Sequence, residues 1–244
     1  MNRPLDSGMD IWQLVGSEAI GVNINDDDLA AGLDALGLPR SRPVVVVVGG
    51  AGRLSASDLD RLRPLISDGI VPVLEERRTV AVDGGTDAGI MRLLGQERSH
   101  QFATFPLVGV VAKGTVILPE VFAQPDAAEM ESHHTHFVVV PGKEWGAEAP
   151  WIAHTATVLA QSAPSVTVLV NGGEIAYTDV KCSVDAGRPV LVVAGSGRTA
   201  DVFDAALRGQ PADEGARALL ASGLVSSVPA DAEAIRAAIG SALD

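Results

Sequence analysis

Five consecutive valines at residues 44–48 constrain the fold of this 244-residue chain more than any other segment. A run that is apolar on both faces is typical of a central strand in a parallel sheet, because helices cover such a strand on both sides. Further runs rich in apolar and β-branched residues follow along the chain. We predict five more strands, at residues 79–83, 107–112, 137–140, 166–170 and 189–194.

Helical patterns separate these strands. Ser55 or Ser57 can cap a helix that begins near Asp58, and Pro64 and Pro72 predict that this helix is kinked or divided in two. Strands that alternate with helices imply right-handed crossovers. The fold class is therefore α/β, a Rossmann-like, doubly wound and mainly parallel sheet with helices on both faces. The other helices are expected at residues 88–98, 148–161, 174–186 and around 200–207.

We expect one domain over the whole chain, because the alternation shows no break in composition and no internal repeat. The loop after residue 112 runs through Pro119 and Pro125 to a polar stretch at 129–135. The expected parts are a core at about 43–208, a peripheral strand (19–24) and helix (26–36) within residues 1–42, and two surface helices within 209–244.

Composition excludes several classes of protein. The net charge of −13 argues against binding nucleic acid or an anionic membrane, which need an extended basic face, but leaves room for a small anionic ligand. The single cysteine, Cys182, allows no intrachain disulfide, and we interpret it as a small buried apolar residue. No signal peptide is recognisable, and the apolar runs are too short to insert into a membrane. We expect a cytoplasmic protein.

Four predicted strand ends lead into glycine-rich joints. In a doubly wound sheet these joints share the carboxyl edge, where ligands bind near the switch in strand order. Glycine lets the backbone approach a phosphate, and the following helix offers N–H groups and a dipole. A single joint is better explained as a tight turn, but four together, two of them ending in Arg, predict a phosphate-binding edge. The joints are Gly49-Gly50-Ala51-Gly52-Arg53, Gly84-Gly85-Thr86-Asp87, Asn171-Gly172-Gly173-Glu174 and Gly195-Ser196-Gly197-Arg198.

Arg53 and Arg198 each follow a glycine joint directly, and a guanidinium there can add charge-assisted bonds to the same anion. None of the joints is a strict dinucleotide fingerprint, and none contains the Gly-Lys-Ser/Thr of a Walker A loop. The sequence therefore gives little support to NAD binding by a standard fingerprint or to hydrolysis of nucleoside triphosphates. We expect no required cofactor.

The histidines at 133–136 form the other concentration of chemistry. His134 and His136 are two residues apart, so on an extended backbone they face the same side. One hypothesis is a transition-metal pair completed by Glu129 or Glu131. The alternative, which we favour, is that a histidine bonds the ligand or the loop while the others are exposed.

Trp145 follows a predicted strand and lies at the same edge as the glycine joints. Two interpretations stay open for it. The indole can stack on a base of the ligand, or it can pack on the domain as a hydrophobic lid.

Three segments together resemble the SLOG superfamily, in particular the LSDAT group that prokaryotic stand-alone proteins share with the amino-terminal cytosolic region of melastatin-type TRP channels. The resemblance covers residues 43–203. It implies a Rossmann-like domain that senses nucleotide-derived ligands, with ADP-ribose-like molecules the leading class. The segments are Val82-Asp83-Gly84-Gly85-Thr86-Asp87-Ala88-Gly89-Ile90-Met91, His134-Thr135-His136-Phe137-Val138-Val139-Val140 and residues 189–201, which include Gly195-Ser196-Gly197-Arg198.

The same superfamily contains the cytokinin-activating phosphoribohydrolases, whose P-G-G-x-G-T-x-x-E loop holds phosphate and supplies a catalytic Glu. Here Gly172 and Gly173 retain the glycine pair, but Ile175-Ala176 replaces Gly-Thr, and Asp179 stands where the Glu is expected. Asp is one methylene shorter, which displaces its carboxylate by about 1 Å. The basic pair on the preceding helix is missing, since residues 148–161 carry only His154. The resemblance therefore favours binding over hydrolysis.

The predicted function is a sensor that binds a nucleotide-derived ligand, with an ADP-ribose-like molecule first among them, and that forms a homo-oligomer such as a dimer by analogy with the superfamily. The alternative is an N-glycosidase acting on nucleoside 5′-monophosphates, with Asp179, Glu174 or His154 as acid or base. The predicted ligand-binding residues are Gly49, Gly50, Gly52, Arg53, Gly84, Gly85, Thr86, Asp87, His134, His136, Gly172, Gly173, Glu174, Gly195, Ser196, Gly197 and Arg198.

Overall fold

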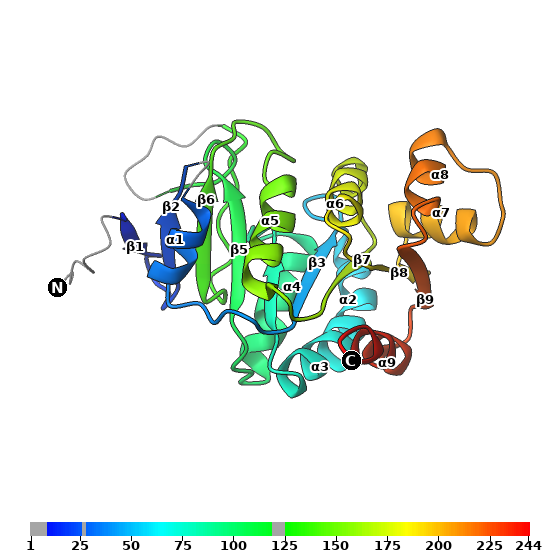
Figure 1. Cartoon of the computed structure of the whole chain (residues 1–244), viewed down its shortest axis with the longest axis horizontal. Coiled ribbons are helices and arrows are strands. Elements are labelled where there is room, and N and C mark those ends of the chain that lie inside the picture. Colours follow the sequence, from blue (N-terminus) through cyan, green and yellow to red (C-terminus); the bar gives the residue numbers. More distant parts are fainter. Residues whose placement is uncertain (1–8, 26–27, 119–124) are drawn as a thin grey trace.

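A nine-stranded sheet runs through the computed structural model, which describes residues 9–25, 28–118 and 125–244 (Figure 1). The order of strands across it is β1-β2-β6-β5-β4-β3-β7-β8-β9, and every pair except β1–β2 is parallel. The strands are β1 (Ile11–Gln13), β2 (Ile20–Asn23), β3 (Val44–Gly49), β4 (Val80–Asp83), β5 (Leu107–Ala112), β6 (His136–Val140), β7 (Ser165–Val170), β8 (Val190–Ala194) and β9 (Val225–Pro229).

The central pair β3–β7 is where the strand order reverses. From β3 the chain continues through β4, β5 and β6 in one direction, whereas β7, β8 and β9 extend the sheet in the other. The two central strands pair over six residues, from Val44 opposite Ser165 to Gly49 opposite Val170. Their ends therefore lie side by side, while their following loops leave toward opposite faces. Ligands bind in such a crevice in doubly wound folds.

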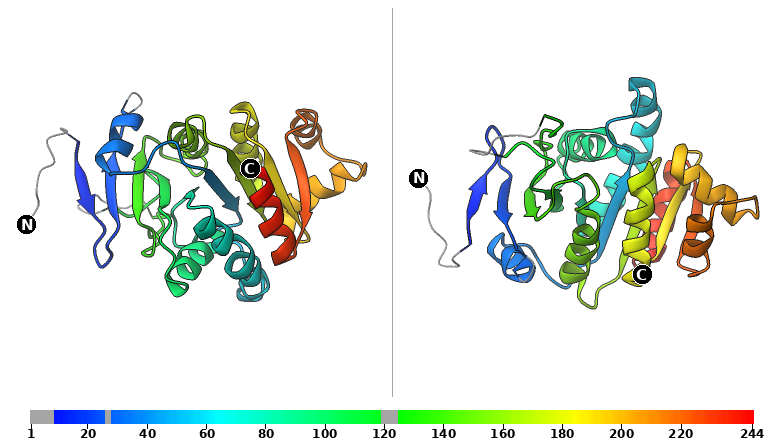
Figure 2. Two further views of the ribbon diagram at one scale, coloured as in Figure 1. Left: turned by 60° about the horizontal axis from the view of Figure 1, so that its bottom comes forward. Right: turned by 90° about the horizontal axis from the view of Figure 1, so that it is seen from above.

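Helices cover both faces, and each face has its own apolar cluster (Figure 2). One face packs α2 (Ala56–Pro64), the π-helix η1 (Leu65–Ile70), α3 (Val71–Glu76), α4 (Gly89–His100) and α9 (Ala232–Ala242). The other face packs α1 (Leu29–Ala35), α5 (Ala149–Ala160), α6 (Glu174–Asp185), α7 (Arg198–Leu207) and α8 (Glu214–Leu220).

All six strands predicted for the core are present, and so is the peripheral strand as β2. The helix expected from Asp58 is capped by Ser55 and continues through the π-helix after Pro64 into α3. Two predictions fall partly outside the described residues. They are the start of the helix predicted at 26–36 and Pro119 in the predicted loop. Cys182 on α6 is half-buried, not fully buried.

The carboxyl-terminal prediction was incomplete. Residues 209–244 contain α8 and α9, but β9 lies between them and pairs with β8. Only Val225 and Val228 of this short strand are buried, so its polar middle gave a weak strand pattern. Helix α9 is not a surface helix on all sides, because Ile235 and Ile239 are fully buried in the core. Strand β1, with three residues, was also missed.

An extended segment, not a helix, leads into β6. Residues 128–131 run beside the loop that follows β4, with Thr86 bridged to Met130. Met130 packs with Phe137 and Val111 in a third apolar cluster. This segment covers the sheet beside α4 and brings its polar side chains against the end of β4.

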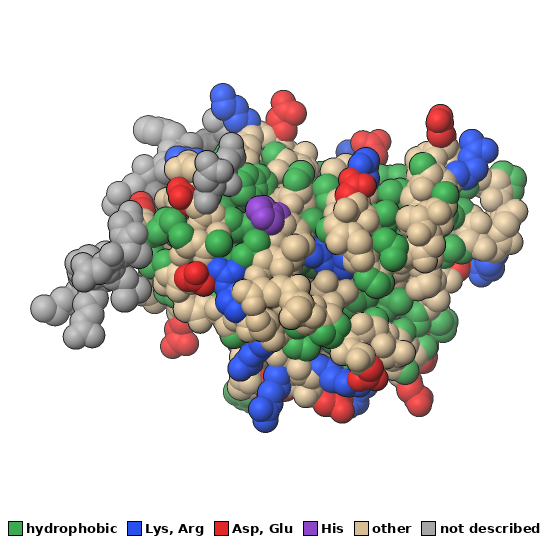
Figure 3. Space-filling model, viewed as in Figure 1, with side chains coloured by type: hydrophobic (Ala, Val, Ile, Leu, Met, Phe, Trp, Pro, Cys, Tyr) green, Lys and Arg blue, Asp and Glu red, His purple; other side chains and the backbone are tan. Residues whose placement is uncertain are grey.

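Charged groups of both signs are interspersed along the edges of the face seen in Figure 3. Within the described residues, no helix has the length and apolar character needed to cross a membrane.

The burial of α9 yields a test of its role in the core. Ile239→Ala removes a fully buried side chain, and we expect the free energy of unfolding to fall by about 2–5 kcal/mol. Ser241→Ala, on the exposed side of the same helix, is the matched control and should change little. Urea denaturation measures both, and equal stabilities of the two variants would show that α9 contributes nothing to the core.

Candidate functional site

Asn171 joins the loops at the ends of β7 and β8. Its backbone N–H donates to Ser196 Oγ (2.7 Å), and its side-chain Nδ2 donates to the Ser196 carbonyl (2.9 Å). Its own carbonyl accepts the N–H of Ala200 in the first turn of α7 (2.8 Å). Asn171 has φ 64°, a left-handed conformation that Asn tolerates better than most residues. Asn171 was not among the predicted ligand-binding residues, although it begins one of the four glycine-rich joints.

The glycine loop after β3 also faces the side chain of Asn171. A Cβ placed on Gly50 would lie 2.6 Å from Asn171 Oδ1, so only glycine fits this close approach. Asn171 is 3 % exposed, and its Oδ1 has no hydrogen-bond partner among the described residues. A buried acceptor without a donor is costly, and a ligand that supplies an N–H or O–H removes that cost.

Helices α6 and α7 both begin at this point. Their N-caps are Gly173 and Gly197, and neither helix has a side-chain cap at its amino terminus. Thr199 Oγ1 donates to the Gly173 carbonyl (2.9 Å), which ties the two helix starts together. Helix amino termini present N–H groups and partial positive charge, so this pair is suited to an anion.

Two arginines flank the loop after β8. Arg61 of α2 donates from Nη1 to the Gly195 carbonyl (2.9 Å) and from Nη2 to the Ser196 carbonyl (3.2 Å). The guanidinium of Arg198 lies against Gly173, where a Cβ would be 2.9 Å from Nη2. Arg61 was not predicted, because it lies on α2 and its contact with the loop after β8 depends on how the elements pack. Arg53 is exposed and Gly52 has open space around it, so the structure does not bring them into this cluster.

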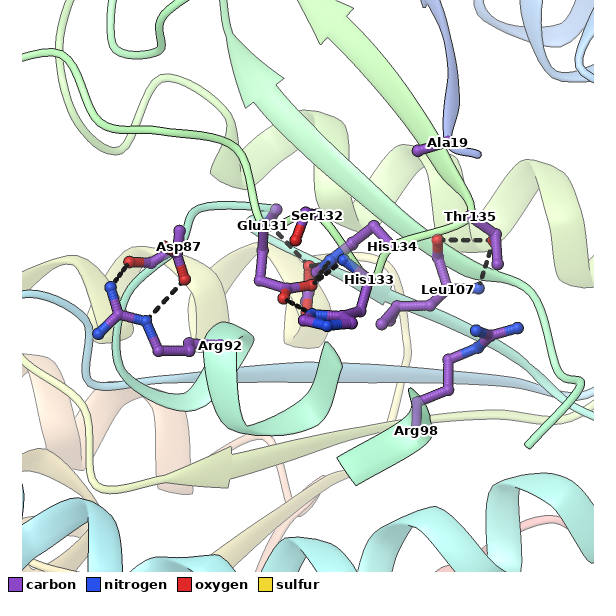
Figure 4. Close-up of polar contacts among 12 residues, drawn as sticks. Ala19, Asp87, Arg92, Arg98, Leu107, Glu131, Ser132, His133, His134 and Thr135 are labelled. Atoms are coloured by element: carbon purple, nitrogen blue, oxygen red, sulfur yellow. Dashed lines mark hydrogen bonds and ion pairs between the residues drawn. The ribbon is translucent and has the colours of Figure 1, made fainter. Parts of the chain in front are cut away.

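The loop after β4 is held by internal contacts. Thr86 is buried, and Asp87 accepts a hydrogen bond from Arg92 Nε (2.6 Å; Figure 4). The N–H of Ile90, at the start of α4, donates to the Gly50 carbonyl (2.9 Å). Gly85 and Thr86 are buried in these contacts, so the loop supports the β3 loop through α4.

The two histidines predicted to bind ligand do not meet. His134 has no exposed side-chain surface, and its ring nitrogens contact Asp83 Oδ1 and Glu131 Oε2, both at 2.8 Å. His136 begins β6 and lies level with Val46, within β3 and before its glycine loop. Strands β5 and β4 separate it from that loop. Burial lowers the pKa of His136 to about 4, so the ring is neutral. Both histidines therefore lie away from Asn171.

The structure does not bring the predicted metal pair together. His134 and His136 do not converge on one point, because the first points into the Asp83–Glu131 pair and the second starts the strand. In the ranges that the structure describes, no three His, Cys, Asp or Glu side chains are grouped as a metal site.

The acid–base candidates lie on α5 and α6. Burial, and then the charge of Glu148, raise the pKa of Asp179 to about 8. Burial also raises the pKa of Glu148, although both of its oxygens accept the N–H of Gly146. Glu174 and His154 are exposed. The surroundings of Asp179 thus favour its protonated form.

An apolar shelf adjoins this pair. Trp145 is 40 % exposed and Ile175 is 37 % exposed, and a Cβ on the intervening Gly146 would be 3.6 Å from the Ile175 side chain. This partial exposure is compatible with both interpretations of Trp145, a platform for a base and a lid that packs on the domain.

Comparison with known proteins gives a family. The family model described as "SLOG in TRPM, prokaryote" matches residues 42–238. Transient receptor potential cation channel subfamily M member 2 of Mus musculus is 23 % identical over 203 residues, or 68 % of this chain and 13 % of the channel. The rat (Rattus norvegicus) protein of the same name is 23 % identical over 196 residues, 66 % of this chain and 13 % of the channel.

A solved structure shares the fold. The molybdenum cofactor carrier protein MCP of Chlamydomonas reinhardtii superposes with a TM-score of 0.54 at 16 % sequence identity, covering 83 % of this chain and 98 % of that protein. At this level of identity the likeness concerns the fold alone. The chain spans 13 % of the length of the two channel subunits, so most of each channel has no counterpart in it.

Asn171 provides a test of the geometry without any ligand. Asn171→Asp keeps the shape and the left-handed backbone but replaces the Nδ2 donor with an oxygen that faces the Ser196 carbonyl. We expect the free energy of unfolding at pH 7 to fall by about 1–3 kcal/mol. Asn23→Asp, at an exposed position, is the control. Thermal and urea denaturation measure both, and an unchanged stability of Asn171→Asp would contradict the role of the amide.

Proposed function

Because this chain belongs to the prokaryotic SLOG-in-TRPM family, we propose that it is a sensor that binds a nucleotide-derived ligand carrying phosphate and ribose, with ADP-ribose as the leading example. The observation that carries the proposal is the switch point between β3 and β7. There Asn171 offers a buried acceptor without a partner among the described residues, beside two uncapped helix starts and two guanidinium groups.

The phosphate of the ligand would bind where α6 and α7 begin. Backbone N–H groups and the helix dipoles favour an anion there, and Arg61 and Arg198 add charge-assisted bonds. Asn171 Oδ1 would accept a hydrogen bond from a ribose hydroxyl. A phosphorylated sugar supplies both an anion for the helix starts and a hydroxyl donor for Asn171 Oδ1, whereas a fully ionised anion has no donor to offer.

The base would lie on the shelf formed by Trp145 and Ile175. An exposed indole next to a polar site is a common platform for a planar base. Asp179 and Glu148, which lie beside the shelf, offer carboxyl groups to the base edge. This arrangement accounts for an exposed aromatic ring that the core does not need.

The setting of the protein belongs to the same proposal. We propose a cytoplasmic homo-oligomer, with the α5 face as the contact between copies, that binds neither nucleic acid nor the membrane directly. The channel activity of the mammalian relatives is not part of the proposal, since the chain covers 13 % of those proteins.

Removal of either arginine should weaken binding. We expect Arg61→Gln and Arg198→Gln each to lower the affinity for ADP-ribose about tenfold to a hundredfold, the cost of losing a charged hydrogen bond. Isothermal titration calorimetry with ADP-ribose, NAD, AMP and cyclic ADP-ribose measures this. Arg217→Gln, an exposed arginine on α8, is the control. Absence of binding across the panel, or equal affinities for all three variants, would contradict the proposal.

A second function is supported by the pKa of Asp179. A carboxyl group that holds its proton near pH 7 can act as a general acid toward a leaving base. In that case the protein hydrolyses the N-glycosidic bond of a nucleoside 5′-monophosphate. The altered Gly-Thr pair of the loop makes this the weaker candidate.

Release of free base decides between the two functions. If the protein is an N-glycosidase, chromatography should detect adenine from AMP, and Asp179→Asn should reduce its release about a hundredfold or more. Because Asn carries no charge where the native carboxyl group is already neutral, the variant should fold, as circular dichroism can verify. No release by concentrated wild-type protein would exclude hydrolysis of AMP and leave the binding role as proposed.

A further inference from the structure

Three buried ionisable side chains join the end of β4 to the segment that leads into β6. The His134 ring lies between two carboxylates, with Nε2 2.8 Å from Asp83 Oδ1 and Nδ1 2.8 Å from Glu131 Oε2. The side chains of His134 and Asp83 are fully buried, and that of Glu131 is 2 % exposed. We call these three residues the carboxylate–imidazole bridge (Figure 4 shows Glu131 and His134 in contact).

The geometry favours a protonated ring. Each ring nitrogen lies 2.8 Å from a carboxylate oxygen, and imidazolium is the form of histidine that donates from both nitrogens. Burial by itself lowers the pKa of His134, but the charges and hydrogen bonds of Asp83 and Glu131 raise it to about 9. The stability that this cation contributes is therefore fully present below its ordinary pKa of 6.5 and is lost as the pH rises through about 9.

The other groups around the ring leave this assignment unchanged. His133 on the same segment contacts Glu131, Arg98 of α4 adds a charge near Glu131, and Phe137 of β6 stacks on the His134 ring. Asp83 Oδ2 is buried with no partner among the described residues. If the ring lost its proton, two buried carboxylates would face each other with no cation between them.

The bridge holds the β4 loop from both sides. Asp83 Oδ1 accepts the N–H of Gly85 (2.7 Å), and the Glu131 N–H donates to the Gly85 carbonyl (2.9 Å). The next turn continues into α4, whose Ile90 N–H donates to the Gly50 carbonyl. A path thus leads from the bridge to the proposed site. It runs from Asp83 to Gly85 by a hydrogen bond, along the chain to Ile90, and from Ile90 to Gly50 by a second hydrogen bond.

Helix α4 is shaped to accept the bridge. A Cβ on Gly95 would overlap Glu131 Oε2, so glycine at this helical position makes room for the carboxylate. Glycine is less favourable than alanine in the interior of a helix. The chain therefore accepts a local loss of helix stability in order to bury Glu131 beside His134.

We propose that His134 is a positioning residue: its imidazolium holds the Gly84–Asp87 loop and the first turn of α4 against Gly50, so that ligand affinity depends on the proton of this ring. The inference rests on the proposed function for its ligand, but the coupling of ring, loop and helix is independent of which ligand binds. His134 acts through Asp83 and Glu131 and does not touch the ligand.

Hydrogen exchange of the full chain tests the coupling without ligand. At pH 7, His134→Gln should raise the exchange rate of amides at residues 84–92 about tenfold or more and leave those of β8 unchanged. His100→Gln, an exposed histidine on α4, is the matched control. If His134→Gln does not fold, Asp83→Asn, which is nearly isosteric, serves in its place. Unchanged exchange at 84–92 in a folded variant would overturn the proposal.

The pH dependence separates positioning from simple stabilisation. In wild type, the affinity for ADP-ribose should fall above about pH 9, together with the protection of residues 84–92. Asp83→Asn removes one carboxylate charge, so the pKa of His134, followed by NMR, and the midpoint of binding should move to lower pH by the same amount. A midpoint that stays while the pKa moves would overturn the inference.

The two failures are distinguishable. If no nucleotide binds at any pH, the proposed function fails, whereas the exchange experiment still decides whether the bridge positions the loop. If ADP-ribose binds and both exchange and affinity ignore His134→Gln, the proposed function stands and the positioning role is wrong.

Discussion

The parallel pairing of β3 with β7 is the constraint on which the rest of the structure depends. Six consecutive residue pairs bring the ends of these strands together, and the loops that follow leave toward opposite faces. Three glycine loops and the starts of α6 and α7 then meet around one buried amide. The site thus follows from strand order more than from any single motif, because no loop by itself carries a complete set of donors.

Much of the fold could be predicted from the sequence. The apolar runs of the core strands are buried on both faces, so each gave an unambiguous signal, and the glycines after them marked the edge correctly. Strand β9 gave no clear strand signal, because only Val225 and Val228 are buried. Its partner β8 is separated from it in the sequence by α7 and α8. Its short polar pattern depends on tertiary pairing for its structure.

The candidate site was less predictable, for physical reasons that differ between residues. The glycines could be found because they follow a strand directly, whereas Asn171, the residue before two of them, was not selected because the need for a buried amide depends on the neighbouring loops. Arg61 reaches the site from a helix on the other face, a relation that strand order alone determines. His134 was chosen for its residue type, yet two carboxylates from separate segments occupy its nitrogens. Spacing within one segment carries no information about such partners.

Gly95 and Glu131 have a consequence for how this sequence can change over time. The two positions occupy one volume, since a methyl group on Gly95 would overlap the carboxylate of Glu131. A lineage that first shortens Glu131 can then accept alanine in the helix and gain helical stability. The reverse order passes through an overpacked intermediate. The geometry therefore imposes a direction on the path of substitution, and a lineage in which both positions have changed in this way has already dismantled the carboxylate–imidazole bridge.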